Sequence, residues 1–236
     1  MALFGLFNRK QSILSSGLLE GATDCHSHIL YGVDDGLRSL EDSLSVLAFL
    51  ESVGIKDLWC TPHIMEDIPN TTEELQARFK ELLAAYKGSI RLHLAAEYML
   101  DTLFEQRLKS EDLLVMEDDT LLVETSTIAE PYDLTGMLQQ IMSAGYHPLF
   151  AHPERYRFLK ESDLDKLYEK GVRFQLNLGS ITGFYGETAK KKAEYLLNKK
   201  MYSAFGSDCH RLTSVKQQYS RESLTKYTIE LLKSII

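Results

Sequence analysis

Short apolar runs alternate with amphipathic stretches along most of the chain. Apolar residues that recur three and four positions apart predict helices, whereas short apolar runs bounded by polar residues predict buried strands. A regular alternation of strands and helices predicts a parallel sheet with right-handed crossovers. The apolar runs span 22–30, 56–63, 90–99, 120–125, 147–152, 172–178 and 202–208, and the helical patterns are clearest over 39–53, 72–87, 133–145, 162–170, 186–199 and 218–234.

Both an open doubly wound sheet and a closed barrel satisfy this alternation, and the polar residues distinguish them. His, Asp and Glu residues lie at the ends of six of the seven runs. In a barrel all strand C-termini meet at one face, where barrel enzymes place their chemistry, whereas an open sheet would spread these residues along an edge. The pattern therefore favours a (β/α) barrel with a site at the C-terminal ends of its strands.

The residues at these strand ends are typical metal ligands. His26 and His28 are two positions apart, so on a strand their side chains point to the same side. Glu97, Glu124 and His152 each follow an apolar run, and a buried charge is costly unless it is paired or bound to metal. A single such residue is more typical of a structural salt bridge, but the whole set favours metal ligation. The candidate ligands are His26, His28, Asp35, His63, Glu97, Glu124, His152, Asp208 and His210, with Asp35 equally compatible with a turn.

Nine ligands are too many for one ion and suit two or three divalent ions that share carboxylates. Mixed imidazole and carboxylate ligands favour manganese, iron or zinc over magnesium alone, and we expect manganese first. With four carboxylates against three ions, such a site keeps positive charge, attracts a phosphate dianion and generates hydroxide from bound water.

An arginine follows His152 closely in the same predicted loop. Arg155 would grip phosphate oxygens beside the ions, with a surface ion pair to Glu154 or Asp163 as the alternative. The C-x₅-R signature of cysteine phosphatases is absent, so Cys25, Cys60 and Cys209 are interpreted as core residues.

The composition limits the partners and the cellular compartment that we expect for this protein. The chain of 236 residues is 44% hydrophobic and 25% charged, which is typical of a globular protein. The formal net charge of −8 argues against a nucleic-acid partner, and no apolar run approaches the length of a transmembrane segment. Three cysteines without a C-x-x-C pair favour the reducing cytoplasm. Residues 1–20 are interpreted as an N-terminal extension with a frayed start.

Taken together, these motifs resemble the PHP (polymerase and histidinol phosphatase) superfamily and, within it, bacterial protein tyrosine phosphatases of capsule and exopolysaccharide systems. The resemblance covers most of residues 22–212. It implies a distorted seven-stranded (β/α) barrel of the PHP type over residues 21–236, as a single phosphatase domain. The motifs that carry it are D-C-H-S-H-I-L at 24–30, V-D-D-G at 33–36, A-E-Y at 96–98, L-V-E at 122–124, H-P-E-R-Y at 152–156 and S-D-C-H at 207–210.

The resemblance also implies how the ligands divide among three ions. His26, His28, Glu97 and Asp208 would hold one ion; Glu97 would bridge to a second, held also by Glu124 and His152; Asp35, His63 and His210 would hold the third. Arg155 matches the arginine expected to bind phosphate. Relatives carry another arginine several residues beyond D-x-H, a role that Arg211 would take here.

The sequence therefore predicts a metal-dependent phosphatase that hydrolyses phosphotyrosine, by metal-activated hydroxide, on a bacterial tyrosine kinase of polysaccharide biosynthesis. Two alternatives stay open. One is a small-molecule phosphoesterase such as a histidinol-phosphate phosphatase, and the other is a non-catalytic, metal-stabilised module that docks a kinase tail.

Overall fold

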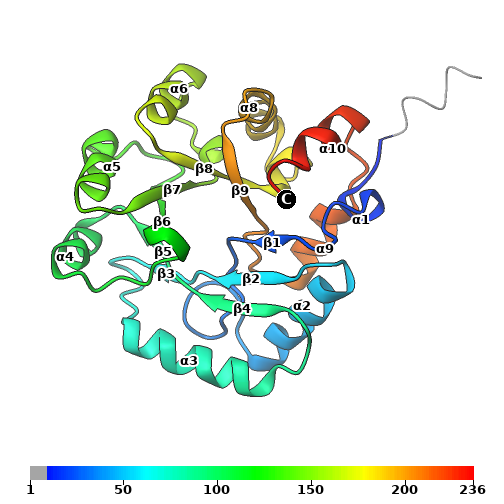
Figure 1. Cartoon of the computed structure of the whole chain (residues 1–236), viewed down its shortest axis with the longest axis horizontal. Helices are drawn as coiled ribbons and strands as arrows, with labels where there is room; N and C mark the ends of the chain where they lie inside the picture. Colours follow the sequence, from blue (N-terminus) through cyan, green and yellow to red (C-terminus); the bar gives the residue numbers. More distant parts are fainter. Residues whose placement is uncertain (1–9) are drawn as a thin grey trace, which may run out of the picture.

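Two parallel β-sheets form the framework of the computed structural model, which describes residues 10–236 (Figure 1). One sheet has three strands in the order β1-β2-β4, and the other has six in the order β3-β5-β6-β7-β8-β9. The predicted parallel α/β architecture is confirmed. The strands are β1 (Thr23–Asp24), β2 (Asp57–Cys60), β3 (His63–Ile64), β4 (Arg91–Leu94), β5 (Glu97–Met99), β6 (Thr120–Glu124), β7 (His147–Ala151), β8 (Arg173–Asn177) and β9 (Tyr202–Gly206).

The seven predicted runs become nine strands because two of them are interrupted. The run at 56–63 divides into β2 and β3, and the run at 90–99 divides into β4 and β5. Pro62 lies at the first interruption and has no N–H to contribute to the ladder. Hydrogen bonds from Ala95 N to Cys60 O and from Glu97 N to Pro62 O, both 3.0 Å, continue across the interruptions. The two runs therefore stay neighbours throughout.

Further hydrogen bonds join the last strand of the larger sheet to the first strand of the smaller one. Cys25 N donates to Phe205 O at 3.0 Å, and Asp208 N donates to His26 O at 2.8 Å. Figure 1 shows the strands around a common centre with the larger helices outside them. As a result, the segments that follow the strands meet at one face of the molecule.

The helices between the strands follow the predicted pattern closely. The Ser39 hydroxyl accepts the Asp42 N–H at the start of α2, and Thr71 and Glu74 form a capping box at the start of α3. The helices α4 and α7 lie outside the predicted helical patterns. The helices that connect or follow strands are α2 (Leu40–Ser52), α3 (Thr72–Ala85), α4 (Thr102–Ser110), α5 (Leu134–Ser143), α6 (Glu161–Glu169), α7 (Leu178–Ile181), α8 (Glu187–Asn198), α9 (Leu212–Ser220) and α10 (Lys226–Leu232).

The prediction of one helix over 218–234 is wrong, because α9 and α10 are separate. Between them, the backbone of Leu224 pairs with Gln11 in an antiparallel bridge, with N–H···O distances of 2.9 Å in both directions. Backbone groups used in this bridge are not available for an intrahelical ladder. A contact between distant parts of the chain thus ends the helical pattern.

Residues 10–20 pack onto the rest of the fold. The short helix α1 (Ile13–Ser16) contacts α9, and Ile13 and Leu19 are buried in the main hydrophobic core. The frayed start predicted for the chain falls largely on residues 1–9, which lie outside the described residues. Within residues 10–236, no helix is long and apolar enough to cross a membrane.

Candidate metal centre

The nine predicted ligands all lie at the face where the strands end. Seven of them line a cavity of about 340 Å³, and His26 and His28 lie fully buried beside them. Each comes from the segment that its run predicted: His26 and His28 after β1, Asp35 before α2, His63 in β3, Glu97 in β5, Glu124 in β6, His152 after β7, and Asp208 and His210 after β9.

Two histidines and two carboxylates, here called the deep group, lie close together in the interior: His26, His28, Glu97 and Asp208. The Nε2 atoms of the two histidines lie 3.1 Å apart, and Glu97 Oε2 lies 3.1 Å from the first and 3.3 Å from the second. Asp208 Oδ1 lies 3.6 and 3.4 Å from the same two nitrogens. Ligands bound at about 2.0–2.2 Å to one transition metal lie about 3–3.5 Å from one another. The deep group has this spacing.

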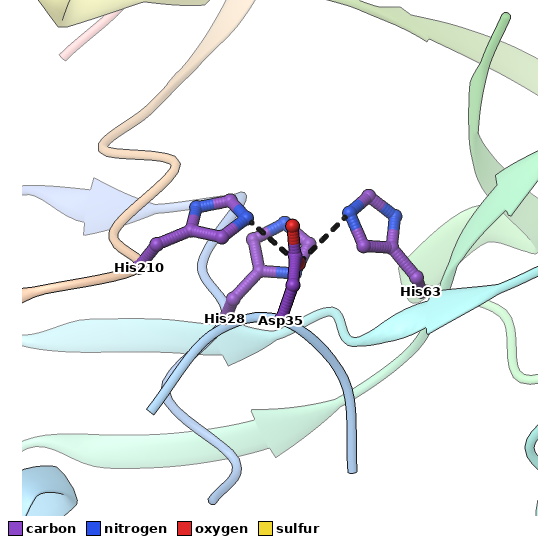
Figure 2. A group of neighbouring side chains, drawn as sticks. All are labelled: His28, Asp35, His63 and His210. Atoms are coloured by element: carbon purple, nitrogen blue, oxygen red, sulfur yellow. Dashed lines mark ion pairs between the residues drawn. The ribbon is translucent and has the colours of Figure 1, made fainter. Parts of the chain in front are cut away.

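A second cluster, the outer group, consists of Asp35, His63 and His210, and His28 of the deep group lies close enough to share an ion with them (Figure 2). Figure 2 shows the Asp35 carboxylate between the imidazole rings of His63 and His210, with His28 in the same group. Asp35 Oδ1 lies 3.2 Å from His210 Nε2 and 3.6 Å from His63 Nε2. The Asp35 side chain is 66% exposed and that of His210 is 29% exposed, so this group opens to solvent.

Glu97 connects the deep group to the remaining candidates. Its Oε2 atom faces the two deep histidines, while its Oε1 atom lies 3.1 Å from His152 Nε2. Glu124 Oε2 lies 3.8 Å from the same His152 nitrogen, and Glu124 Oε1 lies 3.0 Å from His63 Nδ1. A carboxylate whose two oxygens face different ligand sets has the arrangement of a bridging ligand.

The donor set fits divalent cations. His63 Nδ1, Glu97 Oε2 and His152 Nδ1 are buried and make no hydrogen bond of good geometry within residues 10–236, although Glu97 Oε2 and His63 Nδ1 lie near oppositely charged groups. Buried polar atoms without partners are rare, and an ion is one of their ordinary explanations. Imidazole and carboxylate donors together suit zinc, manganese and iron.

The ionisable side chains of this cluster shift one another's pKa values. Burial alone would lower the pKa of His26, but the negative charges of Glu97 and Asp208 raise it to about 9. Burial would raise the pKa of Glu97, but His26 and His63 hold it well below its ordinary value. The hydrogen bond from His210 lowers the pKa of Asp35 to about 2. The Glu97 and Asp35 carboxylates therefore stay ionised and attract cations at neutral pH.

Two of the candidate ligands have a left-handed backbone. The φ angles of His152 and Asp208 are 36° and 50°. This region costs a residue other than glycine of order 1 kcal/mol or more, and it persists where surrounding contacts over-determine it. Here, His152 N donates to Gln175 O at 3.0 Å and Asp208 N donates to His26 O at 2.8 Å. These bonds hold both side chains toward the cavity.

Arg155 lines the same cavity as the candidate ligands. Its Nη1 atom donates to Asp208 Oδ2 at 2.6 Å, and its guanidinium lies 4.5 Å from the centre of the Tyr185 ring. The alternative pairing with Glu154 does not occur, because that carboxylate is buried and accepts from Asn177 N and the Tyr202 hydroxyl. Arg155 is thus positioned between a ligand candidate and the open cavity.

A model of the CpsB/CapC family, described as capsular polysaccharide synthesis, matches residues 22–226. The chain belongs to this family. It is 29% identical over 205 residues to the tyrosine-protein phosphatase CpsB of Streptococcus pneumoniae, with 81% of this chain and 84% of that protein covered. It is 28% identical over 216 residues to the tyrosine-protein phosphatase YwqE of Bacillus subtilis, with 88% and 83% covered. The resemblance to PHP-type tyrosine phosphatases is confirmed.

Solved structures agree with this membership. One from the study of YwqE from Bacillus subtilis and CpsB from Streptococcus pneumoniae, described as unique metal-dependent tyrosine phosphatases, superposes with a TM-score of 0.75 at 26% identity, and 89% of each chain is covered. The phosphotriesterase homology protein of Escherichia coli gives a TM-score of 0.52 at 11% identity, which reflects the fold alone.

In this member of the CpsB/CapC family, three polar residues that sequence reasoning missed support the deep group. Asp34 Oδ2 accepts from His28 Nδ1 at 2.8 Å, Gln175 Oε1 lies 2.9 Å from His26 Nδ1, and Asn177 Nδ2 donates to Asp208 Oδ2 at 2.9 Å. Partners at Nδ1 leave Nε2 of each histidine to face the cavity. A sequence signal for two of them was available: Gln175 and Asn177 alternate with apolar residues in the run at 172–178, the one run with no His, Asp or Glu at its end.

The second predicted arginine lies elsewhere. Arg211 does not line the cavity of the candidate ligands but a separate one of about 350 Å³, with Arg38 and Asp42. His210 lines both cavities. Of the two predicted arginines, Arg155 is therefore the one that lines the cavity of the candidate ligands.

Proposed function

We propose that this chain is a metal-dependent protein tyrosine phosphatase that binds two or three divalent ions at the candidate metal centre. The observation that carries this proposal is the deep group, in which both histidine Nε2 atoms lie 3.1–3.6 Å from a carboxylate oxygen of Glu97 and one of Asp208, with Arg155 on the same cavity. Membership of the CpsB/CapC family, whose relatives include tyrosine-protein phosphatases, supports the same activity.

The ligands are proposed to divide as the resemblance implies. The deep group would hold one ion, Glu97 with Glu124 and His152 a second, and the outer group the third; manganese is the ion we expect first. When bound, such ions activate water as a nucleophile and stabilise negative charge on phosphate.

Within this site, the protein's own residues bind and orient the substrate. The Arg155 guanidinium supplies several N–H donors in a planar fork that matches phosphate oxygens. Asp208 holds this fork through the 2.6 Å hydrogen bond, while Tyr185 supports its face. A tyrosine phenolate leaves without a strong general acid, because its conjugate phenol has a pKa near 10.

We also infer that the two sheets make up one distorted seven-stranded barrel. Two observations support this: the interrupted runs β2–β3 and β4–β5 stay paired throughout, and hydrogen bonds connect the end of β9 to the end of β1. The family's description as capsular polysaccharide synthesis supports a tyrosine kinase of that system as the phosphoprotein substrate. Three free cysteines support a cytoplasmic setting.

The proposal is tested by assaying the manganese-loaded protein on a phosphotyrosine peptide and on histidinol phosphate, with its metal content measured in parallel. We expect turnover of the peptide and a much lower kcat/KM for histidinol phosphate. A preference for histidinol phosphate would instead establish a small-molecule phosphoesterase. Binding of the peptide without turnover, in protein with full metal content, would establish a docking module.

A further inference from the structure

A groove with an excess of positive charge lies between the first turns of α6 and α8. Its volume is about 600 Å³, and four cations line it against one carboxylate: Arg157, Lys160, Lys191 and Lys192 against Glu161. The chain as a whole has a formal net charge of −8, so this basic groove reverses the overall sign. The N-terminal ends of the two helices add partial positive charge to the same place.

Most of these cations are not used within the fold. The arginine and lysine ion pairs of residues 10–236 involve other side chains, and Arg157, Lys160 and Lys191 are exposed. Lys192 is half-buried and donates to the backbone carbonyl of Tyr156. Three exposed cations are therefore available to a partner.

The basic groove adjoins the candidate metal centre through one short segment, residues 155–157. Arg155 lines the cavity of the candidate ligands, and Arg157 lines the basic groove. Arg157 N donates to Thr127 O at 3.4 Å, and Thr127 also lines the cavity. Arg155 and Arg157 are two positions apart, and an extended peptide advances about 3.3 Å per residue, so a peptide with one residue in the cavity can place a neighbouring segment at the groove.

We propose that the basic groove binds an acidic segment, with Asp or Glu side chains a few residues from the phosphotyrosine, of the protein whose phosphotyrosine occupies the cavity. This inference rests on the proposed function and adds a substrate preference to it. A peptide is favoured over a nucleic acid or a lipid surface, because the predominantly negative protein would repel an extended polyanion beyond the groove.

The test compares kcat/KM for two phosphotyrosine peptides that differ only in flanking residues, one with Asp and Glu and the other with Asn and Gln. We expect the metal-loaded protein to prefer the acidic peptide by about tenfold at low salt, mainly through KM, and to lose this preference as salt increases. In the variant Lys160→Gln/Lys191→Gln, the preference should fall to about twofold, since exposed ion pairs contribute up to about fivefold each.

The matched control is Lys170→Gln/Lys200→Gln, which removes the same charge just beyond the C-terminal ends of the same two helices. This control should keep the preference of the unmodified protein. Thermal unfolding of both variants, together with their rates on para-nitrophenyl phosphate, which is too small to reach the groove, reports whether fold and metal centre are intact.

Equal kcat/KM for the two peptides in the unmodified protein would overturn the proposal, as would a preference that survives Lys160→Gln/Lys191→Gln. Binding of anionic vesicles or RNA that depends on these lysines, without a peptide preference, would assign the groove to a different partner and also overturn it. If the metal-loaded protein hydrolysed no phosphopeptide at all, the proposed function would fail. Lysine-dependent binding of the acidic peptide, followed by fluorescence anisotropy, would then test the groove separately.

Discussion

The deep and outer groups of candidate ligands differ in burial and in support. The deep side chains are at most 5% exposed, and Asp34, Gln175 and Asn177 hold three of them from behind. In the outer group, Asp35 is 66% exposed, and its carboxylate lies 3.2 Å from His210 and 3.6 Å from His63. Preorganised ligands bind an ion without paying to order themselves, so we expect the deep group to retain its ion more strongly.

Removal of the metal ions should have the largest effect on activity. It should also show whether the deep and outer groups differ in how strongly they retain an ion. Exhaustive chelation should abolish phosphatase activity, and manganese should restore it, because bound ions lower the pKa of water enough to supply hydroxide at neutral pH. During a timed dialysis, we expect the first ion to leave from the outer group and the last from the deep group. Activity and metal content measured on the same samples would check this; full activity in metal-free protein would contradict it.

Substitution of one ligand from each group should give unequal losses. Glu97→Gln removes a charge that contacts both deep histidines and His152, so turnover should fall by several kcal/mol of barrier, about a thousandfold or more. Asp35→Asn should cost about tenfold, and excess manganese should recover much of it. Steady-state kinetics across a manganese titration would measure both, and equal losses would remove the distinction between the groups.

Glu124→Gln and His152→Ala test the connection between the groups. Both residues lie around Glu97 rather than in the packed core, so the fold should survive and turnover should fall by a few kcal/mol. Kinetics combined with metal analysis would show whether one ion is lost. Near-normal rates with full metal content in both variants would exclude these residues from the ligand set.

Arg155→Ala should reduce kcat/KM for phosphotyrosine peptides by about ten- to a hundredfold, since a lost hydrogen bond to a charged group costs about 1.5–3 kcal/mol. Metal content should stay largely intact. Arg155 contacts Oδ2 of Asp208, whereas Oδ1 is the oxygen that faces the deep histidines. Arg155→Lys should recover only part of the loss. Arg211→Ala is the control, and a loss as large as that of Arg155→Ala would place Arg211 at the phosphate after all.

Asp34→Asn should have the smallest effect on turnover at saturating metal. The amide still fits behind His28, but it cannot fix the histidine as a carboxylate does, so metal affinity should fall by about ten- to a hundredfold. Isothermal titration with manganese would measure this loss. An unchanged affinity would show that burial alone orients His28.

The sequence by itself determined the elements and most of the candidate site. Apolar runs and helical spacing report which residues are buried, and burial depends on local pattern, so the strand positions and five of the six predicted helices appear where they were expected. Eight of the nine candidate ligands were identifiable because ionisable residues at the ends of apolar runs need a partner, whereas Asp35 was distinguished from a turn residue only by the family resemblance. Their convergence followed from one general property of parallel strands, whose C-terminal ends meet.

Tertiary structure decided which residues act together across long separations. Gln175 meets His26 from 149 positions away, and the bridge between Gln11 and Leu224 ends a pattern that local spacing alone would continue. The interruption of two runs, the separate cavity of Arg211 and the basic groove between α6 and α8 likewise depend on how neighbouring segments pack. Local sequence encodes periodicity and burial, whereas the identity of a partner is fixed only when strand order and register bring distant residues to one place.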